Sequence, residues 1–286
     1  MDNNIYCQNL YPGVYFGIID QENDSHILLD ENLDYSEFGK YFSSEYAGKL
    51  IQKHSNSTDF LYNFYEYFED FKPLTKLLFG TKFFVSSEYS VSNSNVIGYR
   101  ITSNYEDPIN CMPILQIDNS QLIWNKEKYS RNIVVCSVDN NISKINYNTS
   151  DNLIAFSYAM KEINKLLTRD DDWFKYHYQK NVNIIEGNFT KFESEILVSY
   201  SVQIDEMKFN SGIFLLDTQG NFIDFVKEFL NDDYNYNIVI GTIDLENDGI
   251  LEILVETGYY EGSGYELWSY KENKFVKICN GLYYGS

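Results

Sequence analysis

The 286 residues of this chain are enough for one large domain or two modest domains with hydrophobic cores, and no apolar run approaches the roughly 18 residues of a membrane-spanning helix. Acidic residues number 42 against 22 basic ones, which gives a formal net charge of −20. Because no cluster of basic side chains is present to neutralise phosphates, this balance argues against nucleic acid and anionic membranes as partners and leaves cations, basic proteins and carbohydrate open.

Aromatic residues make up 17% of the chain, mostly tyrosine and phenylalanine, which favours strands over a long-helix bundle. The predicted fold class is therefore α+β and β-rich, with antiparallel sheets and two or three helices. We expect an N-terminal α+β domain over residues 1–148. A second domain, over residues 149–286, is expected to contain a helix and tandem β-repeats.

In the N-terminal half, short apolar or alternating runs separated by polar turns predict strands of an antiparallel sheet. These runs are 14–19, 82–85, 96–101, 114–117, 122–124 and 133–138. The acidic segment 20–25 has the spacing of a metal loop, but Ser25 stands where glycine is needed and Leu28 where an acid is needed. We interpret this segment as a hairpin turn.

A helix is predicted between Thr58, a plausible N-cap, and Pro73, which ends it. Four aromatic side chains repeat within it at helical spacing: Phe60, Phe64, Tyr67 and Phe71. We interpret this stripe as a buried face, with a ligand groove or partner interface as the alternative.

The clearest predicted helix covers residues 150–169, with Ser150 or Asp151 as its N-cap. Five side chains keep three-four spacing along one side, which predicts the buried face: Leu153, Phe156, Met160, Ile163 and Leu167. The three adjacent aspartates at 170–172 follow the helix. Adjacent side chains do not face one point, so we interpret them as a solvated terminus and not as a metal or acid–base site.

Two later segments resemble each other, which predicts an internal duplication. Gly187-Asn188-Phe189-Thr190 leads to Glu195-Ile196-Leu197-Val198, as the segment from Gly241 leads to Glu252-Ile253-Leu254-Val255, and Ser211-Gly212 answers Ser263-Gly264. Repeats of this length are typical of stacked or propeller-like β-units. We expect a degenerate copy at about residues 184–225, with residues 222–230 as a helical insertion between the copies.

The segment 241–278 contains the most specific motif in the chain. Three acids, Asp244, Glu246 and Asp248, stand at alternate positions, Gly249 follows at the sixth place and Glu252 at the ninth. Ca²⁺ takes several oxygens from a short loop of this spacing, and the glycine permits the sharp turn. The apolar run after Glu252 predicts a turn that enters a strand, and not a helix–loop–helix.

This acidic loop, the strand behind it, the glycine-rich segment 258–264 and a further strand at 265–270 together resemble the FG-GAP or integrin-type calcium-loop repeats of bacterial surface proteins. The resemblance implies Ca²⁺ as the bound ion and a C-terminal part built of two propeller-blade-like repeats. The implied side-chain ligands are Asp244, Glu246, Asp248 and Glu252, and the carbonyl of Ile250 is implied as a fifth ligand.

Four aromatics near the glycine-rich segment are candidates for contact with a partner: Tyr259, Tyr260, Tyr265 and Trp268. Since side chains alternate along a strand, Tyr265 and Leu267 are expected on one face, and Glu266 and Trp268 on the other.

No catalytic motif emerges from the sequence. His26, His54 and His177 do not fall in recognisable nucleophile–base arrangements, and no phosphate-binding glycine loop is present. A pair of facing carboxylates for hydrolysis stays open, because their separation depends on the tertiary structure.

The four cysteines, Cys7, Cys111, Cys136 and Cys279, lack zinc-site spacing. In an oxidising compartment four cysteines allow three sets of pairings, one of which joins Cys7 to Cys279 and Cys111 to Cys136, whereas buried core thiols explain the same residues at least as well.

The sequence therefore predicts a non-enzymatic, calcium-stabilised, β-rich binding protein with an unidentified protein or carbohydrate partner. It is expected to be exported by a bacterium, and so periplasmic or extracellular, if a signal peptide was removed. The polar start Met1-Asp2-Asn3-Asn4 carries no such signal, which otherwise favours the cytoplasm. One alternative is a cytoplasmic acidic interaction or inhibitor protein, such as a toxin-neutralising protein; another is a carboxylate-dependent hydrolase.

Overall fold

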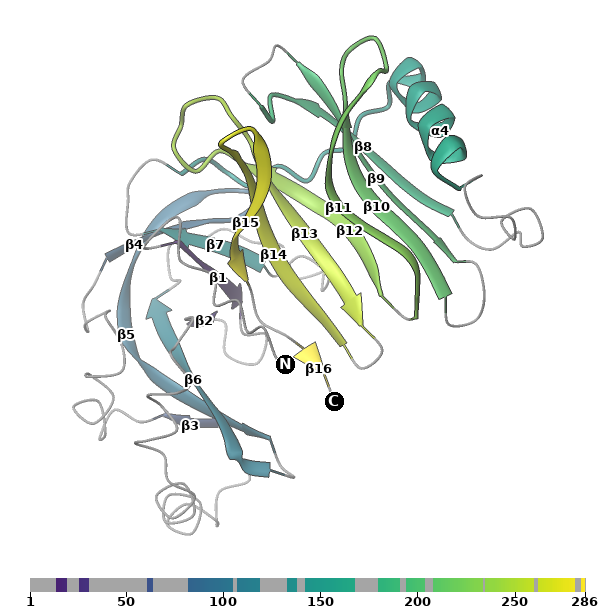
Figure 1. Ribbon diagram of the computed structural model, residues 1–286. Coiled ribbons are helices and arrows are strands. Elements are labelled where there is room, and N and C mark those ends of the chain that lie inside the picture. The colour runs from purple at the N-terminus through teal and green to yellow at the C-terminus, as the bar shows by residue number, and fades with distance from the viewer. Residues whose placement is uncertain are drawn as a thin grey trace. The chain divides into compact units, whose positions relative to one another are not determined.

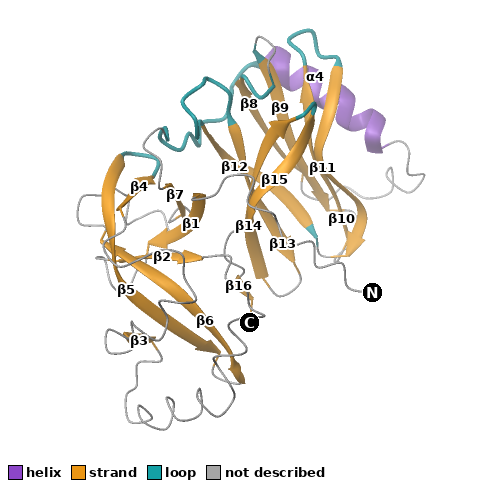
Figure 2. Cartoon of the chain, turned by 60° about the vertical axis from the view of Figure 1, so that its left-hand side comes forward, coloured by secondary structure: helices purple, strands orange, loops and turns teal. Residues whose placement is uncertain are grey.

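The structure is a computed structural model with two compact units, residues 13–140 and a second unit that contains residues 141–286. It describes residues 14–19, 26–30, 61–63, 82–104, 107–118, 133–137, 142–167, 180–190, 194–203, 208–233, 235–259, 262–280 and 284–285. The sequence placed the boundary after residue 148. Figure 2 shows that strands make up most of the described chain.

The unit of residues 13–140 contains one antiparallel sheet (Figure 1). Its strands are β1 (Val14–Ile19), β2 (His26–Asp30), β3 (Leu61–Asn63), β4 (Lys82–Ser86), β5 (Val91–Asn104), β6 (Asp107–Asp118) and β7 (Ile133–Ser137). The order is β3-β5-β4-β7-β1-β2-β6, and β5 also pairs with β6, which closes a ring of six strands. Phe83, Val85 and Val134 are fully buried in this unit.

These strands confirm the predictions at 14–19, 82–85, 96–101, 114–117 and 133–138, the last of which ends at Ser137. The predicted helix after Thr58 is wrong at residues 61–63, which form β3 and pair with residues 100–102 of β5. That pairing is made with a distant segment, which local periodicity does not report. The rest of this predicted helix, segment 20–25 and the predicted strand at 122–124 lie outside the described residues.

The other unit contains two antiparallel meanders and a helix. The first sheet has β8 (Lys180–Gly187), β9 (Glu195–Gln203), β10 (Lys208–Leu216) and β11 (Phe222–Asp233). The second has β12 (Tyr236–Ile243), β13 (Glu252–Tyr259), β14 (Gly262–Lys271) and β15 (Lys274–Asn280), and the short β16 (Tyr284–Gly285) also pairs with β14. Helix α4 (Leu153–Leu167) is the only helix among the described residues, and it is not long and apolar enough to cross a membrane.

The predicted helical insertion at 222–230 is wrong, because these residues belong to strand β11. Phe225 packs on one face of the sheet and Val226 on the other, as in a strand. The pairing of β10 with β11 contains three register shifts. Such bulges interrupt strict alternation, so that the apolar spacing resembles that of a helix.

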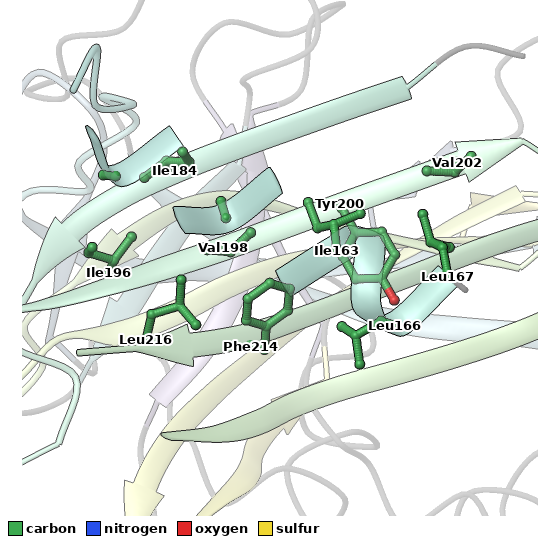
Figure 3. Packing of buried hydrophobic residues seen from close by; sticks show 12 residues of the cluster. Ile163, Leu166, Leu167, Ile184, Ile196, Val198, Tyr200, Val202, Phe214 and Leu216 are labelled. Carbon is green, nitrogen blue, oxygen red and sulfur yellow. The ribbon is translucent and has the colours of Figure 1, made fainter. Parts of the chain in front are cut away.

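Three layers follow from the packing of this unit. Apolar side chains of α4 cover one face of the sheet β8–β11, around Tyr200 and Phe214 (Figure 3). The other face packs against the sheet β12–β15 through a second cluster that includes Leu197, Ile253 and Val255. The sheet β8–β11 is therefore buried on both faces.

Helix α4 confirms the prediction at 150–169 but differs in two details. Asn152 is its N-cap, because Oδ1 of Asn152 accepts hydrogen bonds from the amides of Ile154 (3.0 Å) and Ala155 (3.3 Å). The buried side chains are Ala155, Ala159, Ile163, Leu166 and Leu167. Leu153 and Phe156, predicted as buried, are 82% and 45% exposed. Ala155 and Ala159, and not the larger Leu153 and Phe156, therefore make the contact in the first part of the helix.

Candidate metal centre

The predicted calcium loop is the turn between β12 and β13. Ile243 pairs with Glu252 where the strands meet the turn. The segment 142–147 runs beside the end of β12, and the amide of Asp244 donates to Ser143 Oγ at 2.9 Å. Both ends of the loop are thus fixed by backbone pairing, whereas residues 246–249 are exposed.

Asp244 organises the loop around its carboxylate. Oδ1 of Asp244 accepts from the amide of Asp248 at 3.2 Å, and Oδ2 accepts from the amide of Gly249 at 2.9 Å. Asn247 and Gly249 adopt positive φ angles of 53° and 83°. Glycine adopts this conformation at little cost, so Gly249 permits the chain to fold back over Asp244.

Glu252 is buried, with 3% of the residue exposed. Its Oε2 accepts from the amide of Leu245 and its Oε1 from Ser269 Oγ, both at 3.0 Å. Burial, together with the negative charges of Asp244 and Asp248, raises the pKa of Glu252 to about 7, although the two hydrogen bonds lower it. These three predicted ligands therefore lie close enough to repel one another.

The other predicted ligands are arranged differently. Glu246 pairs with Lys271, with 3.5 Å between Oε1 and Nζ, and 47% of the Glu246 side chain is exposed. Ile250 donates its amide to Asp248 Oδ1 at 2.9 Å. Within the described part of the chain, no group of three or more His, Cys, Asp or Glu side chains is arranged to hold a metal ion. The carboxylates of Asp244 and Glu252 instead accept hydrogen bonds from backbone and hydroxyl donors, and a carboxylate oxygen keeps a further lone pair when it accepts one bond.

In the matching turn of the other sheet, between β8 and β9, a buried glutamate also accepts hydrogen bonds from the turn, although this turn has no acidic loop. Glu195 is 1% exposed and accepts hydrogen bonds from the amides of Phe189 and Thr190, both at 2.8 Å, and from the Thr190 hydroxyl. Asn188 accepts from the amide of Ser194 at 3.1 Å, in the place that Asp244 takes in the other turn. In both turns, the glutamate at the start of the second strand binds the turn's backbone.

Sequence reasoning missed this stapling role of Glu195 and Glu252. The available signal was a glutamate that precedes the Ile-Leu-Val run in both copies, including the copy without alternating acids. The two turns also contact each other, because the amide of Leu251 donates to the carbonyl of Asn188 at 2.8 Å. A backbone hydrogen bond therefore joins the two turns.

The candidate aromatics divide between the faces of β14. Leu267 is fully buried, and Trp268 packs against the cluster between the two sheets on the side of Glu266, to which its indole Nε1 donates at 2.8 Å. Tyr265 lies on the opposite face, which confirms the predicted alternation. The side chains of Tyr259 and Tyr260 are outside the described residues.

Other predicted residues fall partly outside the described chain. Cys136 and Cys279 are buried. The side chains of Cys7 and Cys111 are not among those described, so both disulfide pairings stay predictions. The side chains of His26, His54, His177 and the aspartates at 170–172 are also outside the described residues, so the interpretations given for them stay predictions.

Comparison with protein-family models, with curated proteins and with solved structures gives no match. The residues of the loop and their contacts therefore carry the functional argument alone.

Proposed function

We propose that this protein is a non-enzymatic, calcium-stabilised, β-rich binding protein whose C-terminal unit contains two FG-GAP-like blade repeats. The observation that carries the proposal is the position of Asp244, Asp248 and Glu252 around one turn, where burial and mutual repulsion raise the pKa of Glu252 to about 7. Like charges held together by backbone pairing destabilise the turn unless a cation neutralises them.

The chain supplies the oxygen ligands that Ca²⁺ prefers. Asp244, Asp248, Glu252 and the carbonyl of Ile250 would hold the ion, and Glu246 would join after it leaves Lys271. A bound Ca²⁺ supplies positive charge that offsets the repulsion between these carboxylates. Asp244 meanwhile gathers the loop amides, and Glu252 fixes the start of β13, so that the neighbouring strands are held in register.

The pairing of the strands supports a duplication. In each meander the glutamate stands at the start of the second strand, as Glu195 in β9 and Glu252 in β13. The repeated Ser-Gly pair lies in the third strand of each, at Ser211 in β10 and Ser263 in β14. If only the turn between β12 and β13 binds metal, the other copy is expected to keep its glutamate, Glu195, and to lack the alternating acids of the loop.

Calcium sites of low affinity require the high calcium concentration outside the cytosol, which favours export to the periplasm or the cell exterior. The unit would then present a calcium-fixed edge to a protein or carbohydrate partner.

The test is thermal unfolding in calcium and in chelator. A ligand that binds only the folded state stabilises it by about 2.7 kcal/mol at a concentration 100 times its dissociation constant. We expect calcium to raise the melting temperature of the wild type and to have no effect on Asp248→Ala, whose exposed side chain is removed without disturbing the core.

Glu252→Gln and Glu195→Gln form a matched pair, because both glutamates staple a turn. Both variants should melt earlier than the wild type, but only Glu252→Gln should lose the response to calcium. Equal melting of the wild type in calcium and in chelator would refute the calcium site. A cytoplasmic acidic interaction protein would then become the preferred function.

A further inference from the structure

A carboxylate flanked by two tyrosines lies on the face of β13 opposite to the one that packs against the sheet β8–β11. Val255 of β13 packs between the two sheets, so the adjacent Glu256 points to the opposite face. Tyr265 of β14 is the direct cross-strand partner of Glu256. Side chains of directly opposed residues in an antiparallel pair are neighbours, so the Tyr265 ring lies beside this carboxylate.

The second ring belongs to Tyr236 of β12. Tyr236 pairs with Gly258, two residues after Glu256 on the same face of β13. A Cβ atom at Gly258 would lie 2.1 Å from Cε1 of Tyr236. The absence of a side chain at Gly258 therefore lets the Tyr236 ring lie across β13 next to Glu256. Its ring also contacts Phe209 of β10, with 5.7 Å between the centroids, so the Tyr236 end of the site borders the sheet β8–β11.

The electrostatics agree with this placement. The pKa of Tyr236 is raised by burial and by the charge of Glu256. Burial, the charge of Glu256 and the neighbouring Tyr236 raise the pKa of Tyr265 to about 12, although a hydrogen bond with Ser263 opposes the shift. Both phenols are therefore neutral at physiological pH and present uncharged rings to the carboxylate.

Glu256 differs from Glu252 and Glu266, the other described glutamates in the strands of this sheet, because no hydrogen-bond donor to it is found among the described residues. Glu252 and Glu266 accept hydrogen bonds from backbone, hydroxyl, indole or ammonium groups. Among the described residues, no hydrogen bond or ion pair involves the half-buried carboxylate of Glu256, and burial alone raises its pKa. A carboxylate withdrawn from water without a donor costs free energy, which a cation would offset.

We propose that Glu256, Tyr236 and Tyr265 form a binding site for an alkylammonium group, as presented by a lysine side chain of a basic partner protein. Aromatic faces attract such cations and the carboxylate supplies the opposite charge. The net charge of −20 would speed the approach of a basic partner. This inference rests on the binding role proposed above and names the chemistry of the partner, but it does not depend on the calcium loop.

The test is a titration followed by amide NMR shifts at residues 256 and 265. The probes are N-acetyl-lysine methylamide, a short lysine-containing peptide, free spermidine, maltose and the uncharged analogue N-acetyl-norleucine methylamide. We expect the lysine amide to bind at this site and the norleucine amide not to bind. Tighter binding of the peptide than of spermidine would assign the ammonium group to a protein, and the reverse order would assign it to a free polyamine.

Three variants locate the site. Glu256→Gln keeps the shape and removes the charge, so it should weaken lysine-amide binding about tenfold, as expected for loss of a partly desolvated charge contact. Tyr236→Leu removes a ring and should also weaken binding. Tyr265→Phe keeps the ring and should bind like the wild type.

Unchanged affinity in Glu256→Gln, or equal binding of the norleucine amide, would overturn the proposal. Maltose shifts that depend on Glu256, with none from the lysine amide, would replace it with a carbohydrate site. Each titration is run in calcium and in chelator. Failure of the calcium site is seen as an absent thermal response, and failure of the ammonium site as absent NMR shifts, so the two failures are distinguishable.

Discussion

The ion pair between Lys227 and Glu266 joins the two sheets of the C-terminal unit. Lys227 of β11 reaches across, and its Nζ lies 2.7 Å from Glu266 Oε2 and 2.9 Å from Thr257 Oγ1. The side chains of Lys227 and Glu266 are only 12% and 9% exposed. Lys277 Nζ at 3.3 Å and the indole of Trp268 also donate to Glu266.

The pair affects its two members differently. Burial lowers the pKa of Lys227, and the attraction of Glu266 does not fully offset it. Burial raises the pKa of Glu266, but Lys227, Lys277 and Trp268 together lower it below the ordinary value of 4.5. Among the described residues, Lys227, Lys277 and Trp268 donate to Glu266, and Lys227 also donates to Thr257. The contribution to stability is therefore assigned to the carboxylate, which would lose the shorter of its two ion pairs if Lys227 were removed.

Lys227→Met tests this reasoning. Removal of one partner of a buried ion pair typically costs about 3–5 kcal/mol. Because Lys277 and Trp268 would still contact Glu266, we expect a loss of about 2–3 kcal/mol in the free energy of unfolding. Urea unfolding would be followed by the fluorescence of Trp268, in a background with Trp124 and Trp173 replaced by Phe.

The control is Lys274→Met, which removes an exposed lysine of β15 and should change the free energy of unfolding by less than about 0.5 kcal/mol. Glu266→Gln should also destabilise the protein, and the double variant should lose less than the sum of the single losses, with a coupling of about 1–3 kcal/mol. A loss below about 0.5 kcal/mol in Lys227→Met, or additive losses, would show that the pair contributes nothing.

Three further outcomes are expected. Gly220 and Gly249 have similar positive φ angles, 81° and 83°, but a Cβ atom at Gly220 would lie 2.4 Å from the Tyr158 ring, whereas a Cβ atom at Gly249 would have nothing within 4 Å. In chelator, Gly220→Ala should therefore lower the melting temperature more than Gly249→Ala. Asn152→Ala removes the N-cap of α4 and should cost about 1 kcal/mol in urea unfolding. In chelator, the free energy of unfolding should fall as pH rises from about 4.5 through about 7. The reason is that the raised pKa of Glu252 makes the folded state bind this proton more tightly than the unfolded chain does. Glu252→Gln should remove this pH dependence.

Each of these outcomes has a contrary result. Equal melting temperatures of Gly220→Ala and Gly249→Ala would mean that the loss of stability arises from the positive φ angle and not from the contact with Tyr158. Unchanged stability of Asn152→Ala would mean that α4 is held by packing alone. A pH dependence that persists in Glu252→Gln would move the titration to another group.

Local patterns determined much of the secondary structure. Alternating or apolar runs between turn residues identified strands such as β1, β4 and β7, and three-four spacing identified α4. These signals arise within a few residues of the chain, where side chains set the backbone conformation directly. The spacing of Asp244, Asp248 and Gly249 likewise located a turn whose backbone wraps around the first acid.

Tertiary contacts decided the rest. Strand β11 follows from pairing with β10 through bulges, and the buried face of α4, which includes Ala155 and Ala159, follows from its packing on the sheet. The Lys227–Glu266 pair and the setting of Glu256 beside Tyr236 and Tyr265 join residues from different strands. A cross-strand neighbour is fixed by register, and register depends on the whole sheet, so no local pattern in the sequence contains it.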